Sequence, residues 1–276
     1  NSSMDGYAVR SSDLKASPVL KVTQRIAAGS SGHLLEAMAA ARIFTGAPVP
    51  PGADAVVMQE DVETLDAEQV RVSVVPPAGQ WIRRRGEDVA SGTVVLARGE
   101  RLGPAALGLA ASIGFDHLQV SRPVRVALFS TGDELVMPGT VAPADMPPGA
   151  IYNSNRFFLR SLLKRLGCEV TDLGIVPDKL DATIAALAAA SQTHDLILTS
   201  GGVSVGEEDH VKPAVEKWGE LTLWSLAIKP GKPFAFGAIR RSESASSAHF
   251  MGLPGNPVSS FVTFLLLVRP FVLALQ

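Results

Sequence analysis

The sequence predicts an α/β fold, in which a three-layer, mostly parallel sheet follows a smaller β-rich region and a partial helical region. From Pro123 onward, near-continuous apolar runs alternate with helical patterns, as expected of strands that are buried on both faces. Before about residue 120, short alternating runs are broken by glycine and proline instead. The chain has 276 residues, 46% of them hydrophobic, which is enough for two cores.

The first half contains three strand candidates and one helix. The strand candidates are "DAVVMQE" (54–60), "VRVSV" (70–74) and "GTVVLARG" (92–99). In "RLGPAALGLAASIG", Pro104 suits a first helical position and Gly114 suits a helix end. These patterns divide the chain into a β-rich domain at 1–90, a partial helical subdomain at 91–122 and an α/β domain at 123–276.

The second half alternates strands with helices. Asn153 is placed to cap the first helix and Gly167 to end it. The expected strands are Val124–Ser130, Glu169–Ile175, Asp195–Ser200, Leu221–Ile228, Pro233–Gly237 and His249–Gly252, and the expected helices are Ser154–Leu166, Leu180–Ala190, one from Asp209 and one from Pro257.

Composition excludes several classes of function. The net charge of −2, from 25 basic and 27 acidic residues, gives no basis for binding nucleic acid or an acidic membrane. The single cysteine, Cys168, excludes an internal disulfide and indicates a buried thiol in a reducing cytoplasm. The longest apolar run, Phe261–Val268, is too short for a membrane span and predicts a buried helix. Because residue 1 is Asn and the chain stops within that last helix, it reads as a fragment.

Four polar loops each follow a predicted strand. They begin at Thr131, Gly201, Lys229 and Pro254. Ligands of parallel sheets lie beyond the carboxyl ends of the strands, so we expect these loops to gather at one edge.

Three of these loops offer features that bind anions. Small residues such as Gly201 and Gly202 let backbone N–H groups approach an oxyanion, although a plain tight turn has the same composition. Lys229 and Lys232 share a proline-stiffened turn, which is either an anion site or a solvated hairpin. In "PGNPVSS", Asn256, Pro257 and two serines form either a helix N-terminal anion site or an ordinary cap.

Acidic residues stand among these anion-binding features. Asp133, Glu134 and Asp209 would repel a phosphate. Magnesium resolves the conflict, because it takes one or two carboxylates together with phosphate oxygens. The pattern therefore predicts a phosphorylated ligand with a divalent metal ion, and a second anion at the remaining positive positions. In the first half, Arg83, Arg84 and Arg85 are either a solvated face or a phosphate clamp.

Eight segments together resemble the molybdopterin molybdenumtransferase family of the MoeA type, which is related to the E domains of gephyrin and its plant counterpart. They occur in the family's order over nearly the whole chain, and they are "NSSMDGYAVR", "RIFTGAPVPPGADAVVMQED", "RRRGEDV", "VALFSTGDEL", "IYNSNR", "SGGVSVGEEDHVK", "LAIKPGKPFAFG" and "GLPGNPVSS". The family's N-terminal helical segment and C-terminal β domain have no counterpart in these residues.

The resemblance implies a fold, a reaction and a site. The α/β domain would be the MogA-like molybdopterin-binding domain. The enzyme would take adenylylated molybdopterin and molybdate as substrates, insert molybdenum and release AMP with the help of Mg²⁺. It would form a homodimer with an inter-subunit active site, and the molybdopterin adenylyltransferase is a further partner. The catalytic residues would be Asp5, Asp88, Glu134, Asp178 and Asp209, with Glu134 and Asp209 on the metal, and the substrate-binding residues would be Thr45, Thr131, Gly201, Gly202, Ser204, Lys229, Lys232, Pro254, Pro257 and Ser259.

Three other functions remain as alternatives at this stage. A molybdopterin adenylyltransferase would share the α/β domain, but the β-rich half with "SMDGYA" argues against it. A non-catalytic scaffold module would not need the acids and lysines. A nicotinamide dehydrogenase lacks support because no GxGxxG opens the α/β half.

Overall fold

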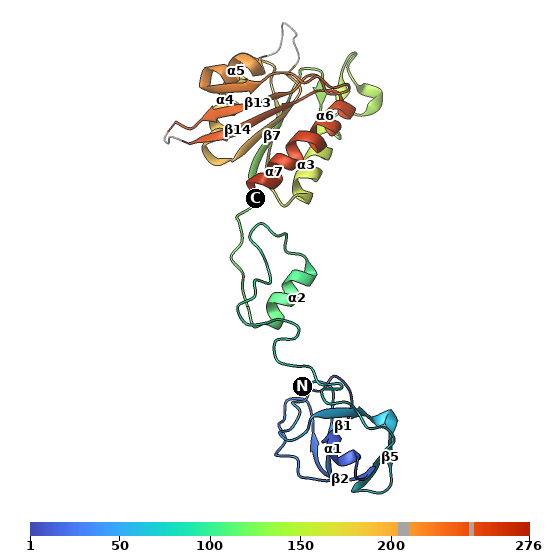
Figure 1. The fold of residues 1–276 in the computed structure, drawn as a ribbon. Helices are drawn as coiled ribbons and strands as arrows, with labels where there is room; N and C mark the ends of the chain where they lie inside the picture. The colour runs from blue at the N-terminus through green and yellow to red at the C-terminus, as the bar shows by residue number, and fades with distance from the viewer. Residues whose placement is uncertain (204–209, 243–245) are drawn as a thin grey trace. The chain divides into compact units, whose positions relative to one another are not determined.

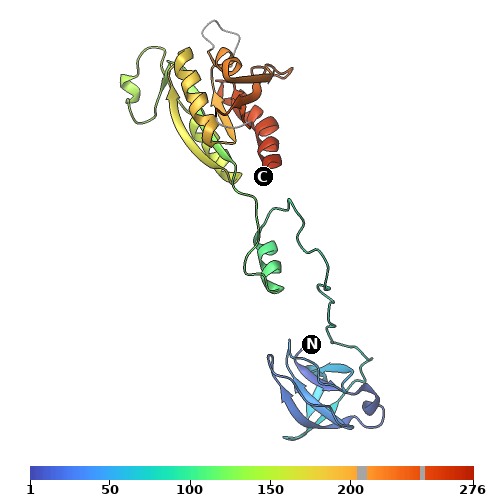
Figure 2. The same cartoon turned by 90° about the vertical axis from the view of Figure 1, so that its left-hand side faces the viewer.

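The computed structural model describes residues 1–203, 210–242 and 246–276. The chain forms two compact units, Asn1–Asp116 and His117–Gln276 (Figures 1 and 2). Each unit contains a six-stranded sheet.

The first unit is built on a mixed sheet. Its strand order is β4-β1-β3-β2-β6-β5, and β2 and β3 are parallel while the other neighbours are antiparallel. Apolar residues are buried on both faces, with Ile26 and Ile43 in one core and Leu20 and Val57 in the other. The elements are β1 (Gly6–Val9), α1 (Ser11–Leu14), β2 (Val19–Ile26), β3 (Ala39–Ile43), β4 (Ala55–Met58), the 3₁₀ turn η1 (Gln59–Asp61), β5 (Val62–Thr64) and β6 (Gln69–Val72).

The strand expected at 92–99 is wrong, whereas the helix after it is confirmed. Residues 92–99 contain no strand, and Val94 is 79% exposed, because their apolar side chains have no neighbouring strand to cover them. The helix α2 (Pro104–Ser112) starts with Pro104 in its first turn, and Gly114 follows it at φ +95°.

The second unit has the expected three layers (Figure 1). Its sheet order is β10-β7-β11-β14-β13-β12; β10, β7, β11 and β14 are parallel, and β13 is antiparallel to both of its neighbours. The strands are β7 (Arg125–Thr131), β10 (Glu169–Val176), β11 (Leu196–Ser200), β12 (Gly219–Leu223), β13 (Ala235–Arg240) and β14 (Ser247–Leu253), with the short pair β8 (Leu135–Val136) and β9 (Ile151–Tyr152) and the 3₁₀ turn η2 (Pro143–Asp145) beside them.

Alternate residues of the central strands pack against different helices. Val126 and Leu128 of β7 join the core under α3 (Asn155–Arg165) and the C-terminal helix. Ala127 and Phe129 join the core under α4 (Leu180–Thr193) and α5 (Val211–Trp218). The continuous apolar run of β7 therefore reflects burial on both faces. Asn153 Oδ1 accepts a 3.4 Å bond from the Arg156 N–H, and Gly167 ends α3 at φ +83°.

Two of the later expectations need correction. The strand expected at Leu221–Ile228 ends at Leu223, just after a register shift in its pairing with β13 between Leu221 and Leu223. The strand expected at Pro233 begins at Ala235, since proline has no N–H to donate to a ladder. Residues 224–234 nevertheless lie at the predicted edge, because Ala235 pairs with Gly252 near the end of β14. The start expected at Asp209 lies outside the described residues.

The C-terminal helix joins α6 (Pro257–Thr263), a π-helical turn (Phe264–Val268) and α7 (Arg269–Leu275). In the described part of the chain it alone has the length and hydropathy to cross a membrane, with 19 residues and a mean hydropathy of 2.1. Core helices meet the same criterion, and its Phe264, Val268 and Val272 are buried against the sheet.

Candidate functional site at the carboxyl edge of the parallel sheet

The carboxyl ends of β7, β11 and β14 lie next to one another. Ser130, Ser200 and Leu253 are register partners in neighbouring parallel strands. The segments 131–134, 201–203 and 254–256 therefore start side by side, together with 177–179 after β10 and 224–234 before β13. We call these segments the carboxyl rim. The structure thus gathers Thr131, Gly201, Lys229 and Pro254 at one edge, as the sequence predicts.

Two glycines pack tightly around Thr131. Gly201 and Gly202 have φ values of +92° and +68°, a backbone region that favours glycine. A Cβ on Gly201 would lie 2.5 Å from the Thr131 carbonyl oxygen, and one on Gly202 would lie 2.6 Å from Thr131 Oγ1. Thr131 is only 3% exposed, and its Oγ1 has no hydrogen-bond partner among the described residues. A buried hydroxyl of this kind is a donor left over for a ligand.

Two asparagines that link the loops of the rim complete its polar lining. Asn155 Nδ2 donates to Ser200 Oγ at 2.8 Å and to the Gly255 carbonyl oxygen at 2.7 Å. Within the described part of the chain, Asn155 Oδ1 and Asn153 Nδ2 are buried without partners. Sequence reasoning missed Asn155, whose signal is a second asparagine in "IYNSNR" at the start of an otherwise amphipathic helix.

The acidic residues lie on the exposed side of the rim. Asp133 and Glu134 are exposed, and Asp133 Oδ1 accepts a 3.3 Å bond from the Asp178 N–H. The Glu134 carboxylate covers Gly132, where a Cβ would lie 2.5 Å from Glu134 Oε2. Across residues 1–203, 210–242 and 246–276, no cluster of three or more histidine, cysteine, aspartate or glutamate side chains could hold a metal ion. The predicted Asp209 and Ser204 lie outside those residues.

The lysine loop and the last helix meet at the rim. Lys229 and Lys232 are exposed, while Gly231 between them is buried at φ +111°, where a Cβ would lie 2.8 Å from Thr263 Cγ2. Lys232 also accepts a 2.9 Å backbone bond from Leu226. Asn256 Oδ1 accepts a 3.1 Å bond from the Ser259 N–H and so caps α6, with Pro257 in its first turn. The capping interpretation is therefore confirmed, and the capped end faces the other rim loops.

The remaining predicted residues lie in the first unit. Asp5 Oδ1 accepts bonds from the Thr45 N–H and Oγ1 at 2.7 and 2.8 Å. These bonds, with a smaller contribution from nearby Arg42, lower the pKa of Asp5 below its usual value. Asp88 Oδ2 lies 3.5 Å from Arg83 Nη1, and both side chains are well exposed.

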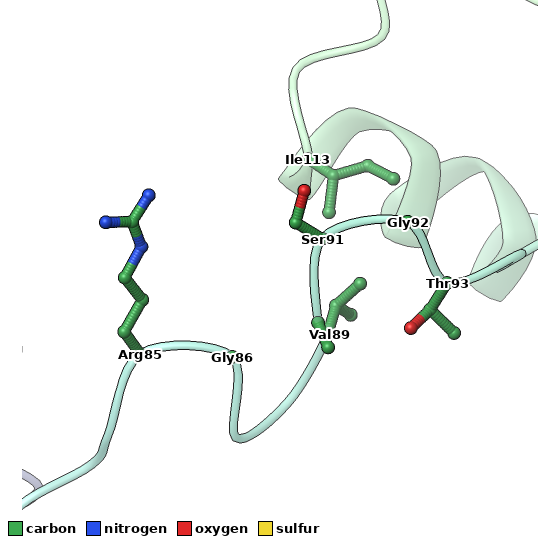
Figure 3. A pocket seen from close by; sticks show the side chains of 8 residues that line it. Arg85, Gly86, Val89, Ser91, Gly92, Thr93 and Ile113 are labelled. Atoms are coloured by element: carbon green, nitrogen blue, oxygen red, sulfur yellow. The ribbon is translucent and has the colours of Figure 1, made fainter.

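The segment around Asp88 bends around a hollow. Arg85, Gly86 and residues 89–93 line a cavity of about 310 Å³, together with Ile113, just after α2 (Figure 3). Arg85, Ser91 and Thr93 supply its polar side chains. The structure thus brings Asp5 and Thr45 together and places Asp88 beside an arginine.

Both units match families of known proteins. Residues 1–114 match the MoeA N-terminal region (domain I and II), and residues 127–274 match a probable molybdopterin binding domain. The molybdopterin molybdenumtransferases of Haemophilus influenzae and Synechococcus elongatus are 47% and 41% identical over 100% and 99% of this chain, which covers 66% and 68% of theirs. Gephyrin of Dictyostelium discoideum is 38% identical over 83% of this chain, which spans 34% of gephyrin.

A solved structure supports the same assignment. The molybdopterin biosynthesis MoeA protein of Pyrococcus horikoshii matches with a TM-score of 0.80 at 33% identity, covering 99% of this chain and 67% of its own. The chain thus spans about two thirds of the length of the relatives it matches. It belongs to the molybdopterin molybdenumtransferase (MoeA) family of molybdenum cofactor biosynthesis.

Proposed function

We propose that this chain carries out the molybdenum insertion step, in which adenylylated molybdopterin and molybdate give the molybdenum-loaded pterin and AMP. Family membership supports the proposal, and the chemistry of the carboxyl rim agrees with it. The rim combines lysines and glycine-lined backbone, which suit a phosphoanhydride and an oxyanion, with carboxylates that suit an accompanying cation.

The observation that carries the proposal is the buried hydroxyl of Thr131, which packs against Gly201 and Gly202 and has no hydrogen-bond partner among the described residues. Leaving such a donor unsatisfied costs about 1–3 kcal/mol. An oxyanion that accepts a hydrogen bond from this hydroxyl would recover that free energy. Because both glycines lack a Cβ, the oxyanion can approach the backbone N–H groups at the same time.

The roles proposed for the other residues rest on the family resemblance and on the chemistry of their side chains. The sites of the phosphate and molybdate oxygens are held or shaped by Lys229, Lys232, Ser204, Pro254, Pro257 and Ser259. Thr45 does the same from the first unit. Glu134, Asp178 and Asp209 position the attacking group and accept protons during phosphoanhydride cleavage. Asp5 and Asp88 act from the first unit of a second copy of the chain, in an inter-subunit site of a homodimer.

Magnesium fits the oxygen-rich rim. Glu134 and Asp133 supply exposed carboxylate oxygens, the kind of ligands that Mg²⁺ takes alongside water and phosphate. Glu134 and Asp209 are the proposed metal ligands. The ion would neutralise charge on the phosphoanhydride when it is bound.

Further parts of the proposal concern the setting of the enzyme. It would act in the cytoplasm and receive its substrate from the molybdopterin adenylyltransferase. The division into a β-rich domain at 1–90, a partial helical subdomain at 91–122 and an α/β domain at 123–276 also remains a proposal.

AMP release tests the function. The 276-residue chain and the full-length protein are each incubated with adenylylated molybdopterin, Mg²⁺ and molybdate. We expect molybdate-dependent AMP release from the full-length protein, and at least a tenfold decrease in Lys232→Ala. Lys164→Ala provides a matched control, since Lys164 is an exposed lysine near the opposite end of α3.

The outcomes separate the alternatives. ATP-dependent adenylylation of free molybdopterin would instead assign the adenylyltransferase reaction. Tight binding of a partner peptide without any turnover of pterin by the full-length protein would assign a scaffold. Equal activity of the Lys232→Ala and Lys164→Ala variants would remove Lys232 from the site.

A further inference from the structure

A second cavity, of about 460 Å³, lies in the first unit, on the face of the mixed sheet that carries Tyr7. Tyr7, Val22 and Val70 form its apolar lining, while Arg25 and Arg42 supply positive charge. Thr64 at the end of β5 and Asp66 and Ala67 in the turn that follows it also line the cavity. The volume lies in the range of small-molecule sites.

The two arginines of this cavity form one array with the rings of Tyr7, which lines the cavity, and Phe44, which lies outside its lining. Arg25 and Arg42 both lie over the ring of Phe44, with their Cζ atoms 4.6 and 4.7 Å from its centroid. Arg42 Cζ also lies 5.1 Å from the centroid of the Tyr7 ring. Arg42 is held in place by bonds to the Gly6 carbonyl oxygen at 2.9 Å and to Gln59 Oε1 at 2.6 Å. A planar ligand can therefore stack against groups whose orientation is already fixed.

A β-bulge creates this arrangement. The pairing of β2 with β3 shifts register between Val22 and Gln24, so that Arg25 lies opposite Arg42. Without the additional residue, Thr23, the side chain of Arg25 would point to the other face of the sheet. Bulges of this kind are found where a side chain has to be redirected beside a site.

Among the described residues, Arg25 lacks an anion that would balance it, whereas Arg42 lies near enough to the Asp5 carboxylate to lower its pKa. Cross-strand like charges destabilise a sheet, and no carboxylate in the described part of the chain forms an ion pair with either Arg25 or Arg42. Two nearby acids are already paired, Glu68 with Lys21 at 3.2 Å and Glu63 with Arg71 at 2.7 Å. Asp66 lines the cavity, but its Oδ1 accepts a bond from the Glu68 N–H.

We propose that this cavity is a binding site for a planar, phosphate-bearing ligand of the nucleoside monophosphate class. The ring of the ligand stacks against Tyr7 and the Arg42 guanidinium, which both line the cavity. Its phosphate forms an ion pair with Arg25, whose guanidinium has no hydrogen-bond partner in the described residues. The site lies wholly within the first unit and does not depend on the function proposed for the carboxyl rim.

Titration of the 276-residue chain with 5′-GMP, followed by amide NMR, tests the proposal. We expect the largest shifts at residues 22–25, 42–44 and 64–67. Arg25→Gln should weaken binding about tenfold by removing a charge-assisted contact. Asp66→Asn should strengthen it about threefold by removing the nearest negative charge, an effect that a purely structural role would not produce.

Controls address the part played by each half of the ligand. Arg71→Gln changes an arginine of the same sheet that is paired with Glu63, and should bind within twofold of the original chain. Guanosine and inorganic phosphate should each bind at least tenfold more weakly than 5′-GMP. Equal binding of either fragment would overturn the proposal, as would shifts confined to the second unit. Circular dichroism checks that each variant folds, and the Asp66→Asn result decides the question if Arg25→Gln does not.

Discussion

The two edges of the parallel sheet differ in whether their polar groups have hydrogen-bond partners. At the carboxyl rim, polar atoms of Thr131, Asn153 and Asn155 are buried without partners among the described residues. At the amino edge, Asp195 accepts two bonds from the Arg122 guanidinium at 2.6 and 2.8 Å and one from the Arg125 N–H at 2.9 Å. The exception at that edge is Arg125 Nε, which has no hydrogen-bond partner in the described part of the chain.

This difference separates stability from function within one sheet. A network of ion pairs whose hydrogen bonds are all made stabilises the fold. Buried polar groups without partners lower stability, and they are retained where a ligand satisfies them. The amino edge should therefore contribute to folding and the carboxyl rim to binding. Substitutions at the two edges test this division.

The largest effect is expected from Gly202→Ala at the carboxyl rim. The added Cβ would lie 2.6 Å from both Thr131 Oγ1 and Val211 Cγ2, at a φ of +68°. Strain and overpacking together should cost about 3 kcal/mol of unfolding free energy and abolish turnover. Urea denaturation and the AMP assay measure the two effects.

Gly149→Ala separates the causes of that loss. Gly149 also has a positive φ, +81°, but nothing lies within 4 Å of its Cβ position. It should lose only about 1 kcal/mol, from backbone strain, and keep its turnover. An equal loss at both positions would show that the tight contact with Thr131 is unimportant.

Asp195→Asn should destabilise the second unit by about 2–3 kcal/mol, because it leaves Arg122 and the Arg125 N–H without their charged acceptor. The bonds from Arg122 are the main reason that the pKa of Asp195 lies well below its usual value, and Arg125 contributes less. A lowered pKa stabilises the fold above the ordinary value near 3.8, and the stabilisation is lost as the pH falls towards the folded-state pKa.

The unfolding free energies of the Asp195→Asn variant and the original chain should therefore differ most at neutral pH and converge as the pH falls below about 4. Urea denaturation at several pH values measures this convergence. Turnover of the folded Asp195→Asn variant should stay within twofold of the original. A large loss of turnover at full folding would instead place the amino edge in the reaction.

Thr131→Val is expected to change stability and activity in opposite directions. Removing an unpartnered hydroxyl should raise the unfolding free energy by up to about 1 kcal/mol, while turnover should fall about tenfold. Thr199→Val is the control, because Thr199 Oγ1 is also buried with no partner in the residues that the structure describes, but lies within β11. That variant should gain similar stability and keep its turnover. An equal loss of turnover in both variants would show that the Thr131 hydroxyl has no specific role in the reaction.

How much the sequence predicted depended on burial and on register. Strands buried on both faces, such as β7 and β11, are continuous apolar runs, so their positions and the rim at their ends could be predicted. The end of β12 could not, because its register shift against β13 comes from pairing between distant segments.

Site residues divide in the same way. Glycines and lysines at strand ends predict an anion site from the sequence. The role of Asn155, in contrast, arises from contacts with Ser200 and Gly255, 45 and 100 residues away. The array around Phe44 was missed because a single additional residue in β2 brings Arg25 and Arg42 together. Periodicity alone places Arg25 on the opposite face.

The smallest effect concerns Cys168, which directly precedes β10 at the amino edge. Its thiol is buried beside Leu163, and this burial raises its pKa to about 11. Since the thiolate is the reactive form, the folded protein at pH 8 should react with a disulfide reagent about 100-fold more slowly than the urea-unfolded chain. Cys168→Ala should leave turnover unchanged. Rapid modification of the folded protein, accompanied by loss of turnover, would show that the amino edge also contains reactive chemistry and that the two edges are not divided as proposed.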